Sequence, residues 1–344
     1  MKVASSLVSG LQPGPELAAA AVSSALAEAG LIRAEQVILL LSREFSRHPQ
    51  AAILAAARSA GTTQVCGGTA NGLFTERSWQ IDQPAAAALV FDREATDQST
   101  NDEFTNDELI FSFTGHSTLP QEWQTGPARA GLLDSNAATW AHGRQTPLGN
   151  SETRLPGLQT SLAISTGLHR LGKAQPVEKS KSYELFRIGG HSALESLRRS
   201  LPAALRQHPP LHHVAAQRQP GTPGIAIISA NADGSLTMAA PLEAGEEITW
   251  AIRQPMSAEQ DMRDSLLAAV DRKKTPNFAL MFSCIGRGPL FYGDDDHDLL
   301  AFREQFPGLP LLGAYGSGQI APVAGQNCLF QNSVITLLFE STHV

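Results

Sequence analysis

FALMFS at residues 278–283 is the counterpart of VILLLS at residues 37–42, and the similarity extends outward from both runs. Continuous apolar runs of this length are typical of strands that are covered on both faces. Each run is followed by a helical segment, a short strand, a glycine segment and a further apolar strand. The glycine segments are GGTANG at 67–72 and GAYGSG at 313–318, both of the form Gly-x-x-x-x-Gly. The sequence therefore predicts that one supersecondary unit occurs twice.

The repeated unit reads strand, helix, strand, helix, strand. It extends from the strand at 3–7 to the strand at 88–91, and again from the strand at 248–252 to the strand at 334–339. We predict an α/β fold in which two duplicated β-α-β-α-β units with mixed sheets, related by an approximate twofold axis, flank an inserted strand-rich middle region. The alternative is a chance similarity between two common α/β units.

The middle region carries the expected domain boundary. Its extended segments lie at 109–113, 161–165 and 183–187, and the sequence QPGTPG at 219–224 precedes a strand at 225–228. Because proline and glycine clusters mark connections between domains, we divide the chain into domains 1–220 and 221–344. The polar stretches 92–107 and 134–152 are expected to be long surface loops.

The composition excludes several classes of partner. The chain has 344 residues, of which 26 are basic and 33 acidic, for a formal charge of -7. Binding to nucleic acid or to an anionic membrane needs a basic face, and no such face is indicated. No apolar stretch approaches the ~18 residues of a membrane-spanning helix. We expect no nucleic-acid partner and no membrane association.

The cysteines indicate a reducing compartment. Cys66, Cys284 and Cys328 are too few for a disulfide framework, and each lies beside an apolar run. Reduced thiols are stable in such surroundings. We therefore expect a cytoplasmic protein.

The two glycine segments are the first candidates for a ligand site. Glycine-rich turns at strand ends expose backbone N–H groups, and open α/β sheets bind small molecules there. Neither segment is a nucleotide signature, because the P-loop lysine is missing. The sequence GRG at 286–288 is followed by Pro289 and lacks the third glycine of a dinucleotide fingerprint. The alternative is that these glycines only allow tight turns.

The segment CIGRG at 284–288 leaves the end of the second apolar strand. Arg287, on a glycine-flanked turn, could hold a carboxylate through paired N–H bonds, or could form an ordinary ion pair. Cys284 could be the nucleophile of an enzyme that performs acyl or amide chemistry, or could simply be packed in the core. The enzyme hypothesis requires an imidazole within ~3 Å of the sulfur, or one water away. We favour it less than a packed Cys284.

The acidic run DDDHD at 294–298 is expected to begin a helix, where carboxylates accept hydrogen bonds from free N–H groups. It lacks the spacing of a calcium loop, and the histidines and cysteines lack zinc spacing. We predict no metal and no cofactor.

The motifs CIGRG at 284–288 and PLLGAYGSGQIAP at 310–322 resemble the C-terminal part of the FIST (F-box and intracellular signal transduction) family. The strand at 37, VCGGTANG at 65–72 and YEL at 183–185 with its following helix are similar to the N-terminal and central parts. The resemblance covers nearly the whole chain. It implies a FIST N-like domain at 1–220, a FIST C-like domain at 221–344 and a sensory module in signal transduction. Such a module would bind a small ligand such as an amino acid.

The expected function follows from this resemblance. The chain would sense an amino acid or similar small carboxylate, and it would signal through a separate protein because no kinase, methyl-accepting, cyclase or F-box region is attached. Family members often carry an acidic residue where Gln319 stands. A third hypothesis, beside the sensor and the enzyme, is an interaction scaffold that binds no ligand. The expected ligand-binding residues are Gly68, Thr69, Asn71, Arg287, Tyr315, Gly316, Ser317 and Gln319.

Overall fold

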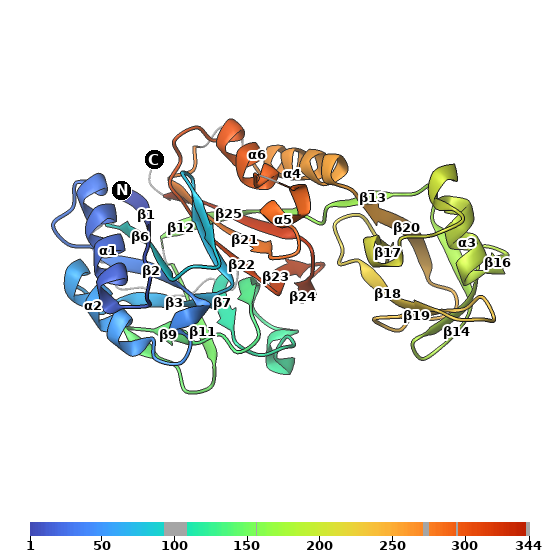
Figure 1. Ribbon diagram of the computed structural model, residues 1–344, viewed down its shortest axis with the longest axis horizontal. Helices are drawn as coiled ribbons and strands as arrows, with labels where there is room; N and C mark the ends of the chain where they lie inside the picture. Colours follow the sequence, from blue (N-terminus) through green and yellow to red (C-terminus); the bar gives the residue numbers. More distant parts are fainter. Residues whose placement is uncertain (93–108, 156, 271–274, 294, 342–344) are drawn as a thin grey trace. The chain divides into compact units, whose positions relative to one another are not determined.

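The structure is a computed structural model that describes residues 1–92, 109–155, 157–270, 275–293 and 295–341 (Figure 1). The expected loop at 92–107 therefore lies outside the described residues from position 93 onward, and so does Asp294. The chain forms two compact units, of which the first contains residues 1–164 and 262–344 and the second contains residues 165–261. Helices and strands are mixed, with strands in the majority, which confirms an α/β protein.

The first unit contains a mixed sheet with the strand order β1-β6-β2-β3-β9-β10. In this sheet β2 and β3 are parallel, whereas β1, β6 and β9 run antiparallel to their neighbours. Helices α1 and α2 end at Gly30 and Gly61, where φ values of 64° and 68° are readily adopted by glycine. The elements are β1 (Val3–Ser9), α1 (Pro15–Ala29), β2 (Gln36–Ser42), α2 (Gln50–Ala60), β3 (Val65–Ala70), β6 (Ala85–Phe91), β9 (Thr139–Ala141) and β10 (Arg144–Gln145).

A second mixed sheet has the order β12-β25-β21-β22-β4-β5. Strands β21 and β22 are parallel, and β25 is antiparallel to β21. The elements are β4 (Gly72–Thr75), β5 (Trp79–Ile81), β12 (Leu158–Ser165), α4 (Pro255–Ala269), β21 (Phe278–Cys284), α5 (Pro289–Tyr292), α6 (His297–Gln305), β22 (Leu311–Gly316) and β25 (Val334–Ser341).

A third sheet has the order β11-β7-β8-β23-β24. Its strands are β7 (Ile110–Thr114), β8 (Arg129–Leu133), β11 (Asn150–Thr153), β23 (Gly318–Val323) and β24 (Gln326–Phe330). The expected surface loop at 134–152 is wrong, because β9, β10 and most of β11 lie within it. The buried Trp140 of β9 holds this segment in the core beneath α1 and α2.

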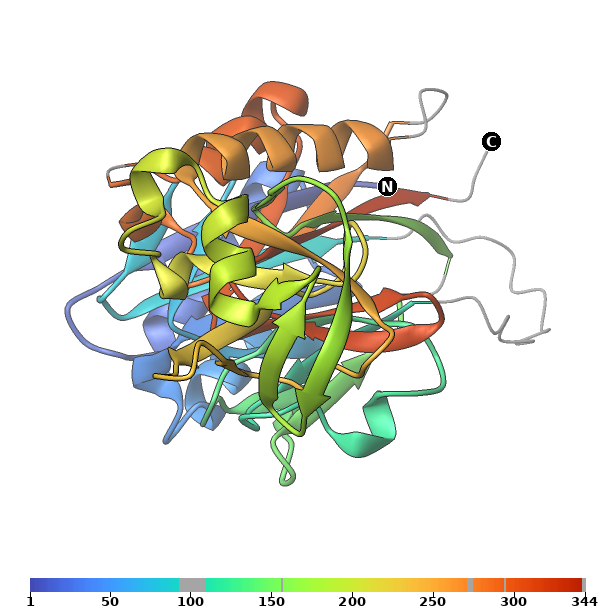
Figure 2. The ribbon, with the colours of Figure 1, turned by 90° about the vertical axis from the view of Figure 1, so that its right-hand side faces the viewer.

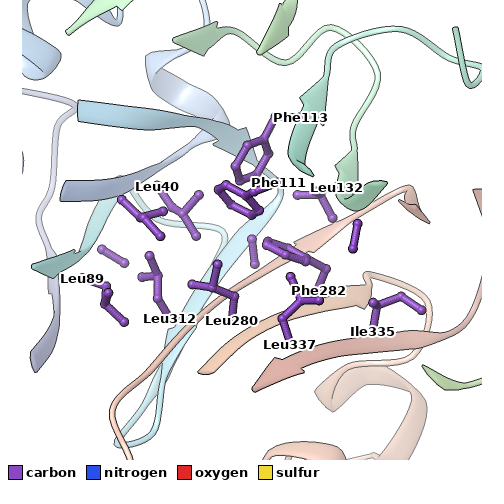
Figure 3. Close-up of a cluster of buried hydrophobic side chains, with 14 of the residues drawn as sticks. Leu40, Leu89, Phe111, Phe113, Leu132, Leu280, Phe282, Leu312, Ile335 and Leu337 are labelled. Atoms are coloured by element: carbon purple, nitrogen blue, oxygen red, sulfur yellow. The ribbon is translucent and has the colours of Figure 1, made fainter. Parts of the chain in front are cut away.

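The core of the first unit lies between the sheets (Figure 3). Along each central strand, alternate side chains point to opposite faces. On β2, Ile38 and Leu40 join the core between the sheets, while the residues on either side of them pack beneath α1 and α2. On β21, Leu280 and Phe282 face the same central core, while Met281 packs beneath α4 and α6. Phe111, Phe113 and Leu132 of the third sheet join the same core, so all three sheets share it, and helices cover the other faces of the first and second sheets.

The second unit is an antiparallel barrel. Its strands follow the order β13-β20-β14-β15-β19-β18-β17, and an additional pairing of β17 with β20 closes the ring. The interior is apolar around the buried Trp250, whose Nε1 donates to Ser196 Oγ of α3 at 3.1 Å. The elements are β13 (Leu168–Arg170), β14 (Gln175–Lys181), β15 (Glu184–Ile188), β16 (His191–Ser192), α3 (Ala193–Ser200), β17 (Val214–Gln217), β18 (Ile225–Ala230), β19 (Leu236–Met238) and β20 (Glu247–Arg253).

The barrel changes two expectations. The strand at 248–252 was expected to open the second β-α-β-α-β unit, but it is β20 and pairs within the barrel, while β12 takes the edge position beside β25. The segment 219–224 does not separate the compact units, because it joins β17 to β18, which pair with each other at Ala215 and Ala226. Short polar connections look alike in sequence whether they join domains or neighbouring strands.

The glycine segments also differ from expectation. They are not loops, because residues 67–70 lie in β3 and residues 313–316 lie in β22, and both strands are buried. Close packing leaves no room for a side chain at Gly67 or at Gly313. A Cβ on Gly313 would lie 2.0 Å from the Phe74 ring, and one on Gly67 would lie 1.9 Å from the Leu39 carbonyl oxygen.

Among the described residues, no helix has both the length and the apolar character needed to cross a membrane.

We expect Gly67→Ala to destabilise the first unit by about 3 kcal/mol or more in urea denaturation, because the new methyl group meets backbone and the φ of 146° is unfavourable for alanine. Gly126→Ala is the matched control. Its φ is 94° but nothing lies within 4 Å of its Cβ, so it should cost only about 1–2 kcal/mol. Equal losses in the two variants would show that close packing at Gly67 is not the constraint.

Candidate functional site

Two chain crossings bring the glycine segments side by side in the first unit. At Asn71 the chain passes from β3 in the first sheet to β4 in the second, and at Ser317 it passes from β22 in the second sheet to β23 in the third. The Asn71 N–H donates to the Tyr315 carbonyl oxygen at 3.0 Å, and Gly72 pairs with Tyr315. The polar residues that follow both glycine strands therefore lie close together.

A hollow of about 540 Å³ opens beside this crossing. It lies at the carboxyl ends of β2, β3 and β8, which is where ligands enter open α/β sheets. Three segments line it: the one that follows β2, the end of β3 with Asn71, and the one that follows β8. The lining residues are Arg43, Glu44, Ser46, Arg47, Thr69, Asn71, Asp134, Ser135, Asn136 and Ala137.

Thr69 and Asn71 hold the floor of the hollow together. Thr69 Oγ1 accepts a hydrogen bond from the Ala138 N–H at 2.9 Å and shares another with Ser46 Oγ at 3.0 Å. Asn71 Nδ2 lies 2.8 Å from each carboxylate oxygen of Asp134. These two predicted residues therefore line one hollow, and they fix the segments on either side of it.

Asp134 is the buried acidic group of the hollow, which the exposed Glu44 also lines. Asp134 was not among the site residues predicted from the sequence. The residue is 7% exposed, and burial raises the pKa of the carboxyl group to about 6, against the lowering effect of hydrogen bonds from Ser317 and Asn71. The carboxylate is thus ionised at pH 7 but titrates in mild acid. The signal that could have found it is an aspartate directly after the apolar strand at 129–133.

The basic groups of the hollow come from the segment after β2. Arg43 and Arg47 are exposed, and the side chain of Arg43 is 64% exposed with Glu44 at 3.9 Å. A guanidinium group carries a positive charge and offers only hydrogen-bond donors. The hollow therefore combines exposed positive charges at its rim with a fixed carboxylate lower down.

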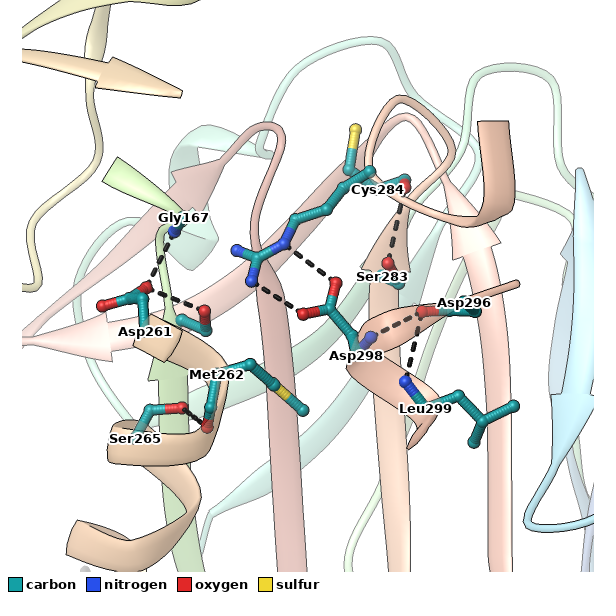
Figure 4. Close-up of polar contacts among 11 residues, drawn as sticks. Gly167, Asp261, Met262, Ser265, Ser283, Cys284, Asp296, Asp298 and Leu299 are labelled. Carbon is teal, nitrogen blue, oxygen red and sulfur yellow. Dashed lines mark hydrogen bonds and ion pairs between the residues drawn. The ribbon is translucent and has the colours of Figure 1, made fainter. Parts of the chain in front are cut away.

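Arg287 does not line this hollow. Its guanidinium group is 2% exposed and binds the Asp298 carboxylate with two hydrogen bonds, from Nε at 2.9 Å and from a terminal nitrogen at 2.8 Å (Figure 4). Burial raises the pKa of Asp298 to about 6, whereas the Arg287 charge lowers it. The structure thus supplies from α6 the carboxylate that Arg287 was expected to take from a ligand.

Tyr315 is also engaged inside the protein. Its hydroxyl group donates to Asp296 Oδ2 at 2.5 Å. Asp296 Oδ1 in turn accepts the N–H groups of Asp298 and Leu299 at the start of α6, at 2.9 and 3.1 Å (Figure 4). The expectation that the acidic run begins a helix is confirmed by this cap.

The remaining predicted residues lie near the crossing but outside the lining of the hollow. Gly68 and Gly316 are buried in their strands. Ser317 Oγ donates to the Leu133 carbonyl oxygen at 3.3 Å and accepts from the Ser135 N–H at 3.4 Å, so Ser317 supports the rim. Gln319 is fully buried, and its amide has no hydrogen-bond partner among the described residues.

Cys284 lies buried at the end of β21. Within the described ranges, no imidazole or carboxylate makes a hydrogen bond with its sulfur, and its backbone N–H donates to the Ser333 carbonyl oxygen. Sulfur without a base is not activated for attack on a carbonyl group. The geometry of these residues thus gives Cys284 no visible catalytic partner.

Comparison with known proteins agrees with the sequence resemblance. Residues 191–322 match the family model described as the FIST C domain, which confirms the expected resemblance to the FIST family. Uncharacterized proteins from two strains of Mycobacterium tuberculosis, CDC 1551 and H37Rv, are 26% identical over 200 residues, as is one from Mycobacterium bovis. The aligned part covers 54% of this chain and 52% of each relative, so the chain spans about half the length of these curated relatives.

We expect Asp298→Leu and Arg287→Leu each to destabilise the protein by about 3–5 kcal/mol, because each leaves a buried charge without its partner. The double variant should cost much less than the two single losses together. A double-mutant cycle in urea measures the coupling. The exposed pair of Arg187 and Glu178, 3.3 Å apart, is the control and should couple by less than about 1 kcal/mol. A buried pair that couples no more strongly would contradict this account.

The free energy of unfolding should fall as the pH rises from about 4 to 6, because Asp134 loses its proton in this range. The folded protein holds a proton on this group more tightly than the unfolded chain, whose pKa is near 3.8, so deprotonation in this window favours unfolding. The contribution amounts to about 3 kcal/mol. Asp134→Asn should remove that part of the slope in urea denaturation across the window, whereas substitution of the exposed Asp82 by Asn should leave the slope intact. Parallel pH profiles for wild type and Asp134→Asn would overturn the assignment.

Proposed function

We propose that this chain, whose residues 191–322 match a FIST C domain, is a sensory protein that binds a small polar molecule in the hollow beside Asn71. The observation that carries the proposal is that Thr69 and Asn71, expected as ligand contacts, line one hollow with Asp134 and two arginines. Its volume of about 540 Å³ falls within the range of small-molecule sites, ~300–1,000 Å³.

The charges of the hollow suit an amino acid. Arg43 or Arg47 offers paired N–H donors to a carboxylate, and Asp134 offers an acceptor to an ammonium group. Asp134 would supply the acidic group that family members often carry at the position where this chain has Gln319. Since Asn71 already orients the Asp134 carboxylate, little ordering remains to be done when the ligand binds.

Arg287, Tyr315, Gly316 and Gln319 remain outside this proposed contact set. They would act on the ligand only through the packing of β22 and β23, because Arg287 and Tyr315 are committed to Asp298 and Asp296. Gly68 would affect the ligand indirectly, through its neighbour Thr69. Ser317 would do so through its hydrogen bond with Ser135.

The wider setting of the function follows the family resemblance. We place the protein in the cytoplasm, since Cys66, Cys284 and Cys328 are all free thiols, and we expect a separate signalling protein as its partner. A duplication of the α/β unit is part of this proposal. It is supported by the shared pattern in which β6-β2-β3 and β25-β21-β22 each combine one antiparallel and one parallel pairing.

The test is a thermal-shift screen with the twenty standard amino acids and small carboxylates, followed by calorimetry on any hit. Mass action predicts about 2.7 kcal/mol of stabilisation at a hundredfold excess over the dissociation constant. For a hit, the analogue without the amino group and the analogue with an amidated carboxyl group should each bind at least about tenfold more weakly, because each loses a charged hydrogen bond.

Two variants connect the binding to the hollow. Asp134→Asn should weaken the amino acid about tenfold or more and leave the deaminated analogue little changed. Arg47→Gln should weaken both, and the exposed Arg58→Gln on α2 is the matched control for loss of charge. If no compound shifts the melting temperature, the chain is not a sensor of these molecules. If both hollow variants bind a hit with unchanged affinity, the ligand does not bind in this hollow.

A further inference from the structure

The second unit has a hollow of its own, which the proposed amino-acid site does not use. Its volume is about 680 Å³, and its lining residues come from α3 and from the segment that follows this helix. Figures 1 and 2 show the ribbon of α3 in yellow-green. The lining residues are Glu195, Arg198, Arg199, Arg206 and Gln207. Three of the five are permanently cationic and only one is acidic, although the whole chain has a formal charge of -7.

The three arginines have no carboxylate partner. Within the described ranges, no acidic oxygen lies within 4.0 Å of a side-chain nitrogen of Arg198, Arg199 or Arg206. Arg206 is nevertheless held in place, because its Nε donates to the Leu201 carbonyl oxygen at 2.9 Å. The Nε atom of Arg198 is buried and makes no hydrogen bond. Because the protein covers this nitrogen, an external anion would reach Arg198 only at its terminal nitrogens, whose positive charge no carboxylate of the described residues balances.

The helix dipole accounts for only part of this arrangement. Arg198 and Arg199 lie in the last turn of α3, where positive charge offsets the free carbonyl groups. Arg206 lies outside the helix, six residues after its last residue, yet it lines the same hollow. A role confined to the helix end would not require a third arginine or a concave surface.

We propose that this hollow binds a small anion that carries several phosphate groups. A guanidinium group can pair with phosphate oxygens through its two terminal nitrogens, which the Nε atoms of Arg198 and Arg206 leave free, and three such groups around one hollow can serve neighbouring phosphates. The lining contains no aromatic or aliphatic residue that could hold a base, so the phosphates rather than a nucleoside would supply the contacts. This ligand is distinct from the amino acid proposed for the first unit.

Inorganic tripolyphosphate is the probe, with citrate as a carboxylate anion of similar charge, both at constant ionic strength. Calorimetry on the full chain should show saturable binding of tripolyphosphate that is at least about tenfold tighter than binding of citrate. Arg198→Gln, Arg199→Gln and Arg206→Gln should each weaken tripolyphosphate about fivefold to tenfold. Glu195→Gln should strengthen it about twofold to fivefold, because one repelling charge is removed.

The gain expected from Glu195→Gln cannot result from misfolding. The exposed Lys173→Gln, also in the second unit but outside the lining, is the control for a general loss of positive charge and should leave the affinity unchanged. The proposal is overturned if tripolyphosphate does not saturate, if citrate binds equally well, or if Lys173→Gln and the arginine variants weaken binding alike. None of these outcomes depends on whether an amino acid binds in the first unit.

Discussion

The first unit depends on strands that must be covered on both faces at once. In β2 and β21 every residue is buried, and alternate side chains are divided between the central core and the layer beneath the helices. Such a strand cannot tolerate a one-residue slip, because a slip exchanges the two sets of side chains between cores. The register of β2 against β3, and of β21 against β22, is therefore fixed by packing on both sides.

This packing determines where polar chemistry can occur. The candidate site lies where the chain leaves one sheet and enters the next, and Asn71 and Ser317 stand at two such places. At the first crossing the polar side chains leave a hollow. At the end of β21, by contrast, Arg287, Asp298, Asp296 and Tyr315 satisfy one another in the interior. Similar sequence positions thus carry an open site in one half and a buried polar network in the other.

Much of the local structure could be predicted from the sequence, since apolar runs and glycine stops act over a few residues. The strands at 37 and 278 and the helices that end at Gly30 and Gly61 are examples. Contacts between distant segments could not be predicted. Asp134 reaches Asn71 only because β8 and β3 end at the same place, and the pairing of β17 with β20 turned an expected α/β strand into part of a barrel. Glycines that permit close strand packing also look like turn glycines in sequence.

The first and last residues of the second unit lie next to each other. The Asp261 carboxylate accepts hydrogen bonds from Ser165 Oγ and from the Gly167 N–H, both at 2.8 Å, and so ties the last residue of the second unit to its first residues. Within the described ranges, none of its strands pairs in the sheets of the first unit. A module with joined ends can be inserted, deleted or exchanged by recombination while the host sheets keep their pairings. The second unit could thus be exchanged in evolution without altering the sheets of the first unit.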